Sequence, residues 1–294
     1  MLTIKRKSGA RLTVDRRGAE LKSWITEDGI ERLWQGDPAY WEETAPWLFP
    51  FVGRLHEKRY TFGGKSYPMD IHGIIRTMDF TVLELLEESI LLELSSSPES
   101  REVYPFDFYL RVRFTLSNHG YASEVSVFHS SESPQAEMIF ALGGHPGFNL
   151  DYPLETYKLE LPQVDQGEVR YAVFSENGLL ESLEELPEDV WLSSDVPTLD
   201  LGRWDFEAND LFLIHPGDRT TLICTECQTE LTMETDGYEI LGLWRAPGAP
   251  YLCLEPWSSL PGREGVVEDL ATKPYMMRLP RGEKKVFRYR VHVA

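Results

Sequence analysis

The chain has 294 residues, at the upper edge of what one sheet-rich domain reaches, and this length buries a core that needs no disulfide or structural metal. Its 29 Lys and Arg residues and 48 Asp and Glu residues give a net charge of −19. A field of that sign repels nucleic acid and anionic lipid, and it favours an uncharged small molecule as ligand. Most of this charge fits a solvated acidic surface without a function of its own.

The N-terminal part of the chain predicts a basic start, one short helix and one hairpin. No apolar stretch long enough for a signal peptide or a membrane span follows residues 1–7, so we expect a cytoplasmic protein that does not enter a bilayer. Residues 38–44, Pro-Ala-Tyr-Trp-Glu-Glu-Thr, predict a short turn of helix. Residues 60–67 carry two glycines between alternating apolar and polar positions, which predicts a tight hairpin.

Strands dominate the rest of the predicted structure. Residues 110–116 and 287–293 alternate between apolar and polar side chains, which is typical of half-buried strands. Residues 265–273 predict one more short helix, and Pro187 interrupts the acidic stretch 181–189. No linker, composition shift or repeat marks a boundary, so we predict one all-β domain over residues 1–294, an antiparallel sandwich of large sheets.

Cysteine usage indicates a reducing compartment. Cys224, Cys227 and Cys253 are odd in number and too sparse for a disulfide framework. The spacing of Cys224 and Cys227 matches redox and zinc motifs, but no second ligand pair is evident. If the segment is a strand, residues three apart point to opposite faces, so we predict a structural role for both. We expect no metal and no cofactor.

Four short stretches stand out because each places ionisable side chains among aromatic residues, Gly and Pro. They are residues 45–55, 71–76, 141–149 and 251–257. The first contains Arg54 after a long apolar run, where an arginine often only reaches the surface. His72 and His145 stand beside glycines, which allow the backbone to bend and a ligand to approach. Taken singly, each histidine is more readily explained by a structural role.

The fourth stretch carries a carboxylate, Glu255. As a strand it puts Leu252 and Leu254 on one face and Glu255 on the other. A carboxylate at the end of an apolar strand costs free energy to bury unless something binds it. Pro256 then stops the strand, and strand ends commonly present functional groups. The residues alone leave a functional and a structural role of Glu255 equally open.

In this order, the four stretches resemble the aldose 1-epimerase (galactose mutarotase) family over nearly the whole chain. The shared motifs are Trp-Gln-Gly-Asp-Pro at 34–38, His-Gly-x-x-Arg at 72–76, Gly-Gly-His-Pro-Gly-Phe-Asn at 143–149 and Leu-Glu-Pro-Trp at 254–257. They are closest to an uncharacterised mutarotase-like branch. The resemblance implies a β-supersandwich with few short helices. It also implies a cofactor-independent isomerase that interconverts the α and β anomers of a hexose.

The resemblance also assigns roles to single residues. It implies that Glu255 is the catalytic base and His145 the acid. It implies sugar-binding roles for Arg54, His72, Asp210, Arg76 and Trp257. Either Trp257 or Trp47 would offer an apolar face to the sugar ring.

Several alternatives stay open at this point. Gly144 stands where galactose-specific relatives usually have asparagine, so the sugar is not identified. The motif around Arg76 is shared with hexose-6-phosphate epimerases, so a phosphorylated hexose is an alternative substrate. A non-catalytic sugar-binding or sugar-sensing protein would need neither base nor acid. A glycoside hydrolase or lyase would use two carboxylates, and Glu255 is the only convincing one. The oligomeric state is also open.

Overall fold

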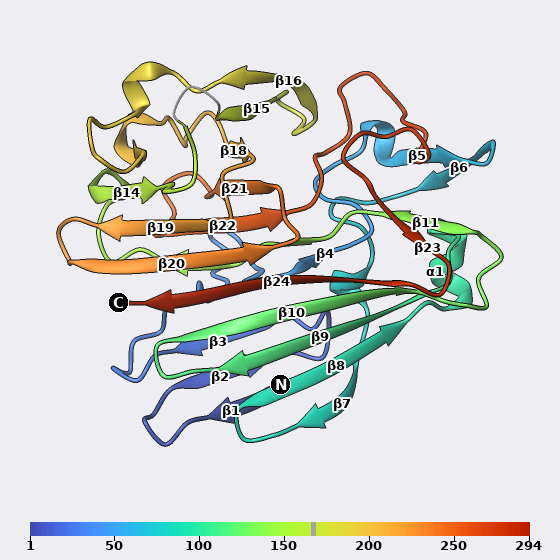
Figure 1. Cartoon of the computed structure of the whole chain (residues 1–294), viewed down its shortest axis with the longest axis horizontal. Helices are drawn as coiled ribbons and strands as arrows, with labels where there is room; N and C mark the ends of the chain where they lie inside the picture. Colours follow the sequence, from blue (N-terminus) through green and yellow to red (C-terminus); the bar gives the residue numbers. More distant parts are fainter. Residues whose placement is uncertain (166–168) are drawn as a thin grey trace.

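The computed structural model describes residues 1–165 and 169–294, and antiparallel strands are its main regular secondary structure (Figure 1). The predicted all-β fold with few short helices is confirmed. In spatial order, the nine-stranded sheet consists of β17 (Thr198–Asp200), β14 (Tyr157–Glu160), β19 (Arg219–Cys224), β20 (Thr229–Asp236), β24 (Lys284–Val293), β10 (Gly120–His129), β9 (Phe108–Leu116), β8 (Ser89–Ser95) and β7 (Thr81–Leu85).

The eight-stranded sheet faces the nine-stranded one. Its order is β16 (Leu180–Glu185), β15 (Arg170–Phe174), β18 (Leu211–Ile214), β21 (Ile240–Trp244), β22 (Tyr251–Trp257), β12 (Gly143–Gly144) and β4 (Trp47–Leu48), with β13 (Gly147–Asn149) also paired to β22. Smaller sheets are formed by β1 (Leu2–Lys5), β2 (Arg11–Val14) and β3 (Leu21–Ile25), by β5 (Arg59–Phe62) and β6 (Lys65–Pro68), and by β11 (Glu137–Phe140) and β23 (Met277–Pro280).

Among the described residues, the helical segments are all short. They are α1 (Pro98–Val103) and the 3-10 helices η1 (His56–Lys58), η2 (Ile75–Thr77), η3 (Leu154–Thr156), η5 (Glu188–Val190) and η6 (Leu201–Arg203). The sequence analysis missed α1, although Ser97 and Pro98 are a recognisable start: the Ser97 hydroxyl accepts a hydrogen bond from the Ser100 amide at 3.2 Å. In the described part of the chain, no helix is long and apolar enough to cross a membrane.

The core lies between the two large sheets. Trp47, on the eight-stranded sheet, packs 5.5 Å from Tyr289 and 6.4 Å from Phe114 on the nine-stranded sheet, measured between ring centroids. Strand β22 is buried along its whole length, because both of its faces are covered. Leu252 and Leu254 face this core, as predicted, so Glu255 lies on the opposite face of the sheet.

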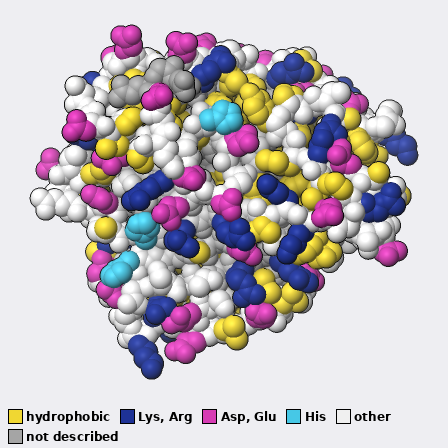
Figure 2. All heavy atoms as spheres, in the orientation of Figure 1, with side chains coloured by type: hydrophobic (Ala, Val, Ile, Leu, Met, Phe, Trp, Pro, Cys, Tyr) yellow, Lys and Arg dark blue, Asp and Glu magenta, His cyan; other side chains and the backbone are white. Residues whose placement is uncertain are grey.

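The outer surface carries charges of both signs. On the face shown in Figure 2, basic and acidic side chains are interspersed. Along the nine-stranded sheet, Arg288 lies 2.8 Å from Glu124 and 3.0 Å from Asp236. Exposed pairs of this kind contribute at most about 1 kcal/mol each, so they serve solubility more than stability.

The predicted strands and hairpin are confirmed, and the two predicted helices are wrong. Residues 110–116 lie in β9, residues 287–293 lie in β24, and the hairpin is formed by β5 and β6. Within residues 38–44, only residues 38–40 make a turn. A helix over these residues would pair the Thr44 N–H with the Tyr40 carbonyl, but this N–H donates to Glu20 Oε1 at 2.7 Å instead.

The second wrong helix, residues 265–273, is a loop held by side chains. The Asp269 carboxylate accepts a hydrogen bond from the Ala271 amide at 2.8 Å, which closes a local turn. Lys273 then turns inward, and Pro274 follows it, which disfavours helical geometry at Lys273.

The expectation that Cys224 and Cys227 form no disulfide is also corrected. Cys224 is the last residue of β19, and Cys227 lies in the turn before β20, so the segment is not a continuous strand. The turn brings the two residues to the same side, where they form a disulfide. Cys253 is a buried free thiol.

A buried ion pair supports the loop of residues 261–273. Lys273 Nζ lies 3.1 Å from Glu268 Oε2 and donates to the Pro261 carbonyl at 2.9 Å. The side chains of Lys273 and Glu268 are only 2% and 3% exposed. Arg263, which is half exposed, reaches the same carboxylate at 3.0 Å. A charge this deeply buried is tolerated only because its partners are in place.

We expect Lys273→Met to lower the free energy of unfolding by about 3 kcal/mol, because it leaves Glu268 buried with only the half-exposed Arg263. Urea denaturation followed by tryptophan fluorescence measures the change. The double variant Lys273→Met/Glu268→Gln should recover much of the loss. A single variant as stable as the parent would show that the pair does not hold this loop.

Candidate active site

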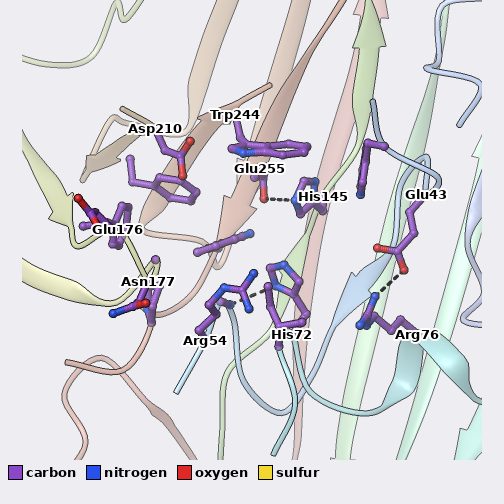
Figure 3. A pocket seen from close by; sticks show the side chains of 18 residues that line it. Glu43, Arg54, His72, Arg76, His145, Glu176, Asn177, Asp210, Trp244 and Glu255 are labelled. Carbon is purple, nitrogen blue, oxygen red and sulfur yellow. Dashed lines mark hydrogen bonds and ion pairs between the residues drawn. The ribbon is translucent and has the colours of Figure 1, made fainter. Parts of the chain in front are cut away.

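A cavity of about 400 Å³ opens on the face of the eight-stranded sheet that is turned away from the main core. Such a volume is within the usual range for small-molecule sites. All seven site residues named from the sequence line it: Arg54, His72, Arg76, His145, Asp210, Glu255 and Trp257. Figure 3 shows most of them pointing into one space from separate segments. The structure therefore brings the predicted residues together, while their roles remain predictions.

Glu255 lies at the bottom of this cavity on β22 and is 0% exposed. Its Oε2 is 3.2 Å from His145 Nε2, and neither carboxylate oxygen has a well-aligned hydrogen bond among the described residues. Burial raises the pKa of Glu255 well above its ordinary value, and the nearby charge of Asp210 raises it further. An under-satisfied buried carboxylate of this kind is a ready acceptor for a polar ligand.

His145 is held between aromatic rings. Its backbone N–H donates to the Pro46 carbonyl at 3.1 Å. Its imidazole lies 4.7 Å from the Trp41 ring and 5.4 Å from the Trp244 ring, measured between centroids. Burial lowers its pKa to about 3, and the positive charge of Arg76 lowers it too. The neighbouring carboxylate does not outweigh this burial, so the free imidazole is neutral at neutral pH.

His72 presents a defined hydrogen-bond donor. Its Nδ1 accepts the N–H of Gly53 at 3.1 Å, so in the neutral ring Nε2 carries the proton. Burial lowers the pKa of His72 well below its ordinary value, and the charges of His145, Arg76 and Arg54 act in the same direction. The ring centroid lies 5.5 Å from that of His145.

The backbone at residues 72–73 explains why this segment contains glycine. His72 has φ +65° and Gly73 has φ +79°. A side-chain carbon at Gly73 would lie 2.1 Å from the Phe49 carbonyl oxygen, so only glycine allows this approach. The unusual φ of His72 and the close packing at Gly73 together turn the imidazole toward the cavity.

Asp210 provides an acceptor across the cavity from His72, and Arg54 provides a donor beside His72 (Figure 3). Asp210 directly precedes β18, and burial raises its pKa to about 6. Arg54 is exposed and forms no ion pair within residues 1–165 and 169–294. The ring of Trp257 packs 4.5 Å from Phe212 and 6.0 Å from His72. Donors, acceptors and an aromatic surface therefore surround Glu255.

The sequence analysis missed part of the lining. The missed side chains include Trp41, Glu43, Phe174, Glu176, Asn177, Phe212 and Trp244. The motif at residues 34–38 was the signal that could have found Trp41 and Glu43, which follow it closely. The alternative platform, Trp47, is wrong, because it is 1% exposed and packs inside the main core.

One set of side chains has the donors for a metal ion. Ligand atoms of His145, Cys253 and Glu255 lie within 4.8 Å of one another, and all three residues are buried. The thiol opposes this use, because burial raises the pKa of Cys253 well above its ordinary value, and the charge of Glu255 raises it further. A metal would have to draw the three groups closer together and displace the thiol proton.

Asp210→Asn is expected to stabilise the protein at pH 7. The folded-state pKa of about 6 exceeds the ordinary 3.8, so Asp210 stabilises the fold only when it is protonated, and this contribution is lost as the pH rises from about 4 through 6. At pH 7 the gain should be about 1 to 2 kcal/mol, allowing for the partial exposure of Asp210. Melting temperatures of parent and variant at pH 7 and pH 4 measure it.

The difference between parent and Asp210→Asn should vanish near pH 4. Asp218→Asn, at an exposed position, is the matched control and should change stability little at either pH. A gain of equal size at both pH values would contradict the assigned pKa shift.

Comparisons with known proteins agree with one another. The aldose 1-epimerase family model matches residues 1–263. Protein LacX of Lactococcus lactis is 30% identical over 256 residues, covering 83% of each chain. A galactose mutarotase related enzyme from Lactobacillus acidophilus is 29% identical, with TM-score 0.87 over 99% of this chain and 96% of that one. A galactose mutarotase-like protein from Lactobacillus casei is 25% identical, with TM-score 0.88 over 100% of both chains. The chain therefore belongs to the aldose 1-epimerase family.

Proposed function

We propose that the chain is an aldose 1-epimerase that interconverts the α and β anomers of a hexose, with Glu255 and His145 as the groups that move protons. The observation that carries this proposal is the buried contact of 3.2 Å between Glu255 Oε2 and His145 Nε2 at the bottom of the cavity. Donors and acceptors that suit sugar hydroxyls surround this pair.

The chemistry needs one base and one acid. The base removes the proton from the C1 hydroxyl, the C1–O5 bond breaks, and the acid gives a proton to O5. The product is the open-chain aldehyde. Rotation about C1–C2 presents the other face of the carbonyl to the C5 hydroxyl. Ring closure then returns both protons to their original groups, so no electrons are gained or lost and the enzyme is regenerated.

The proton balance of the free protein fits this cycle. Burial raises the pKa of Glu255 and lowers that of His145, so a proton shared by the pair favours the carboxylate over the imidazole. This is also the state of the pair when the open-chain aldehyde is bound. Ring opening needs the proton on His145. Hydrogen bonds from sugar hydroxyls to Glu255 favour its ionised form, which leaves the shared proton on the imidazole.

The remaining side chains suit sugar positioning. His72 Nε2–H and the Arg54 guanidinium are donors to hydroxyl oxygens, and the Asp210 carboxylate is an acceptor. The Trp257 ring offers an apolar surface to the C–H face of the sugar. Each such hydrogen bond contributes about 1 to 3 kcal/mol when one partner is charged.

A glycoside hydrolase remains the less favoured reaction for this site. Glu255 is no longer the only candidate carboxylate, because Asp210 and Glu176 also line the cavity. The group in contact with Glu255 is nevertheless the imidazole of His145, which suits paired proton transfer on one sugar ring. A non-catalytic sugar-binding protein is separated by measurement: only the enzyme accelerates the change in optical rotation of freshly dissolved α-glucose or α-galactose.

Glu255→Gln is expected to lower kcat by about 10² to 10⁴-fold, because the isostere keeps shape but cannot take a proton. That loss corresponds to about 3 to 5 kcal/mol of transition-state stabilisation. Sugar affinity should change less. Polarimetry and calorimetric titration measure the two quantities. His145→Asn should behave alike, and the double variant should lose much less than the product of the two single losses.

The control for these variants is Glu185→Gln, which removes an exposed carboxylate from β16 and should leave kcat at the parental value. Near-parental turnover of Glu255→Gln would remove Glu255 as the base and favour the sugar-binding alternative.

A chelator such as EDTA is expected to leave the anomerisation rate unchanged, because the proposed proton transfers use side chains alone. Cys253→Ala should stay within about two-fold of the parent, since the thiol takes no part in the chemistry. Inactivation by EDTA that zinc reverses, together with strong loss in Cys253→Ala, would instead assign a metal to His145, Cys253 and Glu255.

A further inference from the structure

Arg76 meets a carboxylate inside the cavity. Its Nη1 lies 2.7 Å from Glu43 Oε1, and the two side chains are 22% and 31% exposed. Both residues line the same cavity as His72 and His145, and Figure 3 shows the pair beside these two rings. Arg76 is near enough for its charge to lower the pKa of both histidines. The pair is therefore part of the site and not a distant surface contact.

The backbone on the Glu43 side is fixed by a second carboxylate. Glu20 Oε1 accepts hydrogen bonds from the backbone N–H groups of Thr44 at 2.7 Å and Ala45 at 3.2 Å. It also accepts from the Thr44 hydroxyl at 2.7 Å. These bonds fix the backbone directly after Glu43. The Glu43 side chain therefore starts from a fixed point, and its ion pair with Arg76 is less mobile than a pair between two surface side chains.

Across the cavity the charges are predominantly negative. Even when Glu255 is left out because burial favours its neutral form, the carboxylates of Glu43, Glu176 and Asp210 outnumber the guanidinium groups of Arg54 and Arg76 among the described lining residues. Both lining histidines have lowered pKa values and add no positive charge at neutral pH. A phosphate monoester carries about −1.5 to −2 charges at pH 7 and is bound best by free arginines.

We propose that Glu43 is a specificity-determining residue that excludes sugar phosphates. By holding Arg76, it removes one of the two lining arginines from anion binding and places a carboxylate where a phosphate would approach it. The cavity is thereby reserved for an uncharged aldose. This inference rests on the proposed epimerase function and resolves the choice between free and phosphorylated hexoses that the motif around Arg76 leaves open.

The test compares anomerisation of glucose and galactose with that of their 6-phosphates. For the parent protein, we expect kcat/KM for the 6-phosphates to be about 100-fold lower than for the free sugars. Glu43→Gln keeps the shape of the side chain but frees the charge of Arg76. It should raise the ratio of kcat/KM, 6-phosphate over free sugar, by at least about 10-fold.

Two further variants separate the ion pair from the general charge of the cavity. Glu176→Gln removes another lining carboxylate but releases no arginine, so it should change the ratio less than about three-fold. Glu43→Gln/Arg76→Gln should lose the gain. Equal use of both substrates by the parent, an unchanged ratio in Glu43→Gln, or an equal rise in Glu176→Gln would each overturn the proposal.

Calorimetric titration with inorganic phosphate tests the same inference without catalysis. The parent should bind phosphate at least about 10-fold more weakly than Glu43→Gln. Equal affinities would overturn the role of Glu43. If neither the parent nor any variant anomerises a sugar, the proposed epimerase function is wrong. The difference in phosphate affinity would still show whether Glu43 weakens anion binding.

Discussion

Burial of the Glu255 carboxylate is the constraint around which the site is organised. A carboxylate with no access to solvent is costly unless it is neutral or bound. Glu255 lies 3.2 Å from the His145 imidazole and has no well-aligned hydrogen bond among the described residues. The same desolvation acts on His145 with the opposite sign, because an imidazole is charged when it is protonated. One physical cause therefore makes the carboxylate a better proton acceptor and the imidazole a better proton donor.

Strands and loops place different groups of the site. Strand β22 is buried on both faces, which fixes the position of Glu255, whereas His72 comes from a loop with left-handed backbone at two successive residues. Lys273 and Glu268 support this side of the cavity, because Lys273 holds the carbonyl of Pro261, a lining residue. Rigid strands thus carry the proposed proton-transfer group, and tightly packed loops carry the groups proposed to hold the sugar.

Much of the fold and of the cavity lining could be predicted from the sequence. Alternation over residues 110–116 and 287–293 is a local signal, and so is a carboxylate within an apolar strand at Glu255. The expectation that Pro256 stops this strand is wrong, because β22 continues through Pro256 to Trp257, paired with β21. The failures have tertiary causes. The turn after Pro38 does not become a helix because Glu20, 24 positions before Thr44, accepts the Thr44 N–H, a contact that no local pattern shows.

The ion pair inside the cavity could not be predicted from the sequence, because it too depends on a tertiary contact. Glu43 and Arg76 are 33 positions apart, and only the fold shows that they neutralise each other. Cys224 and Cys227 were misjudged because the strand ends between them, and strand ends are the least certain part of a prediction.

The position of β24 in the nine-stranded sheet has a consequence for the order in which the protein is assembled. This last strand lies between β10 and β20, so it joins two parts of the sheet that are made earlier during synthesis. Until it is added, β10 and β20 each present an open edge, which is a hazard for association with other chains. The nascent protein must therefore keep two unfinished half-sheets apart from other chains until β24 emerges from the ribosome.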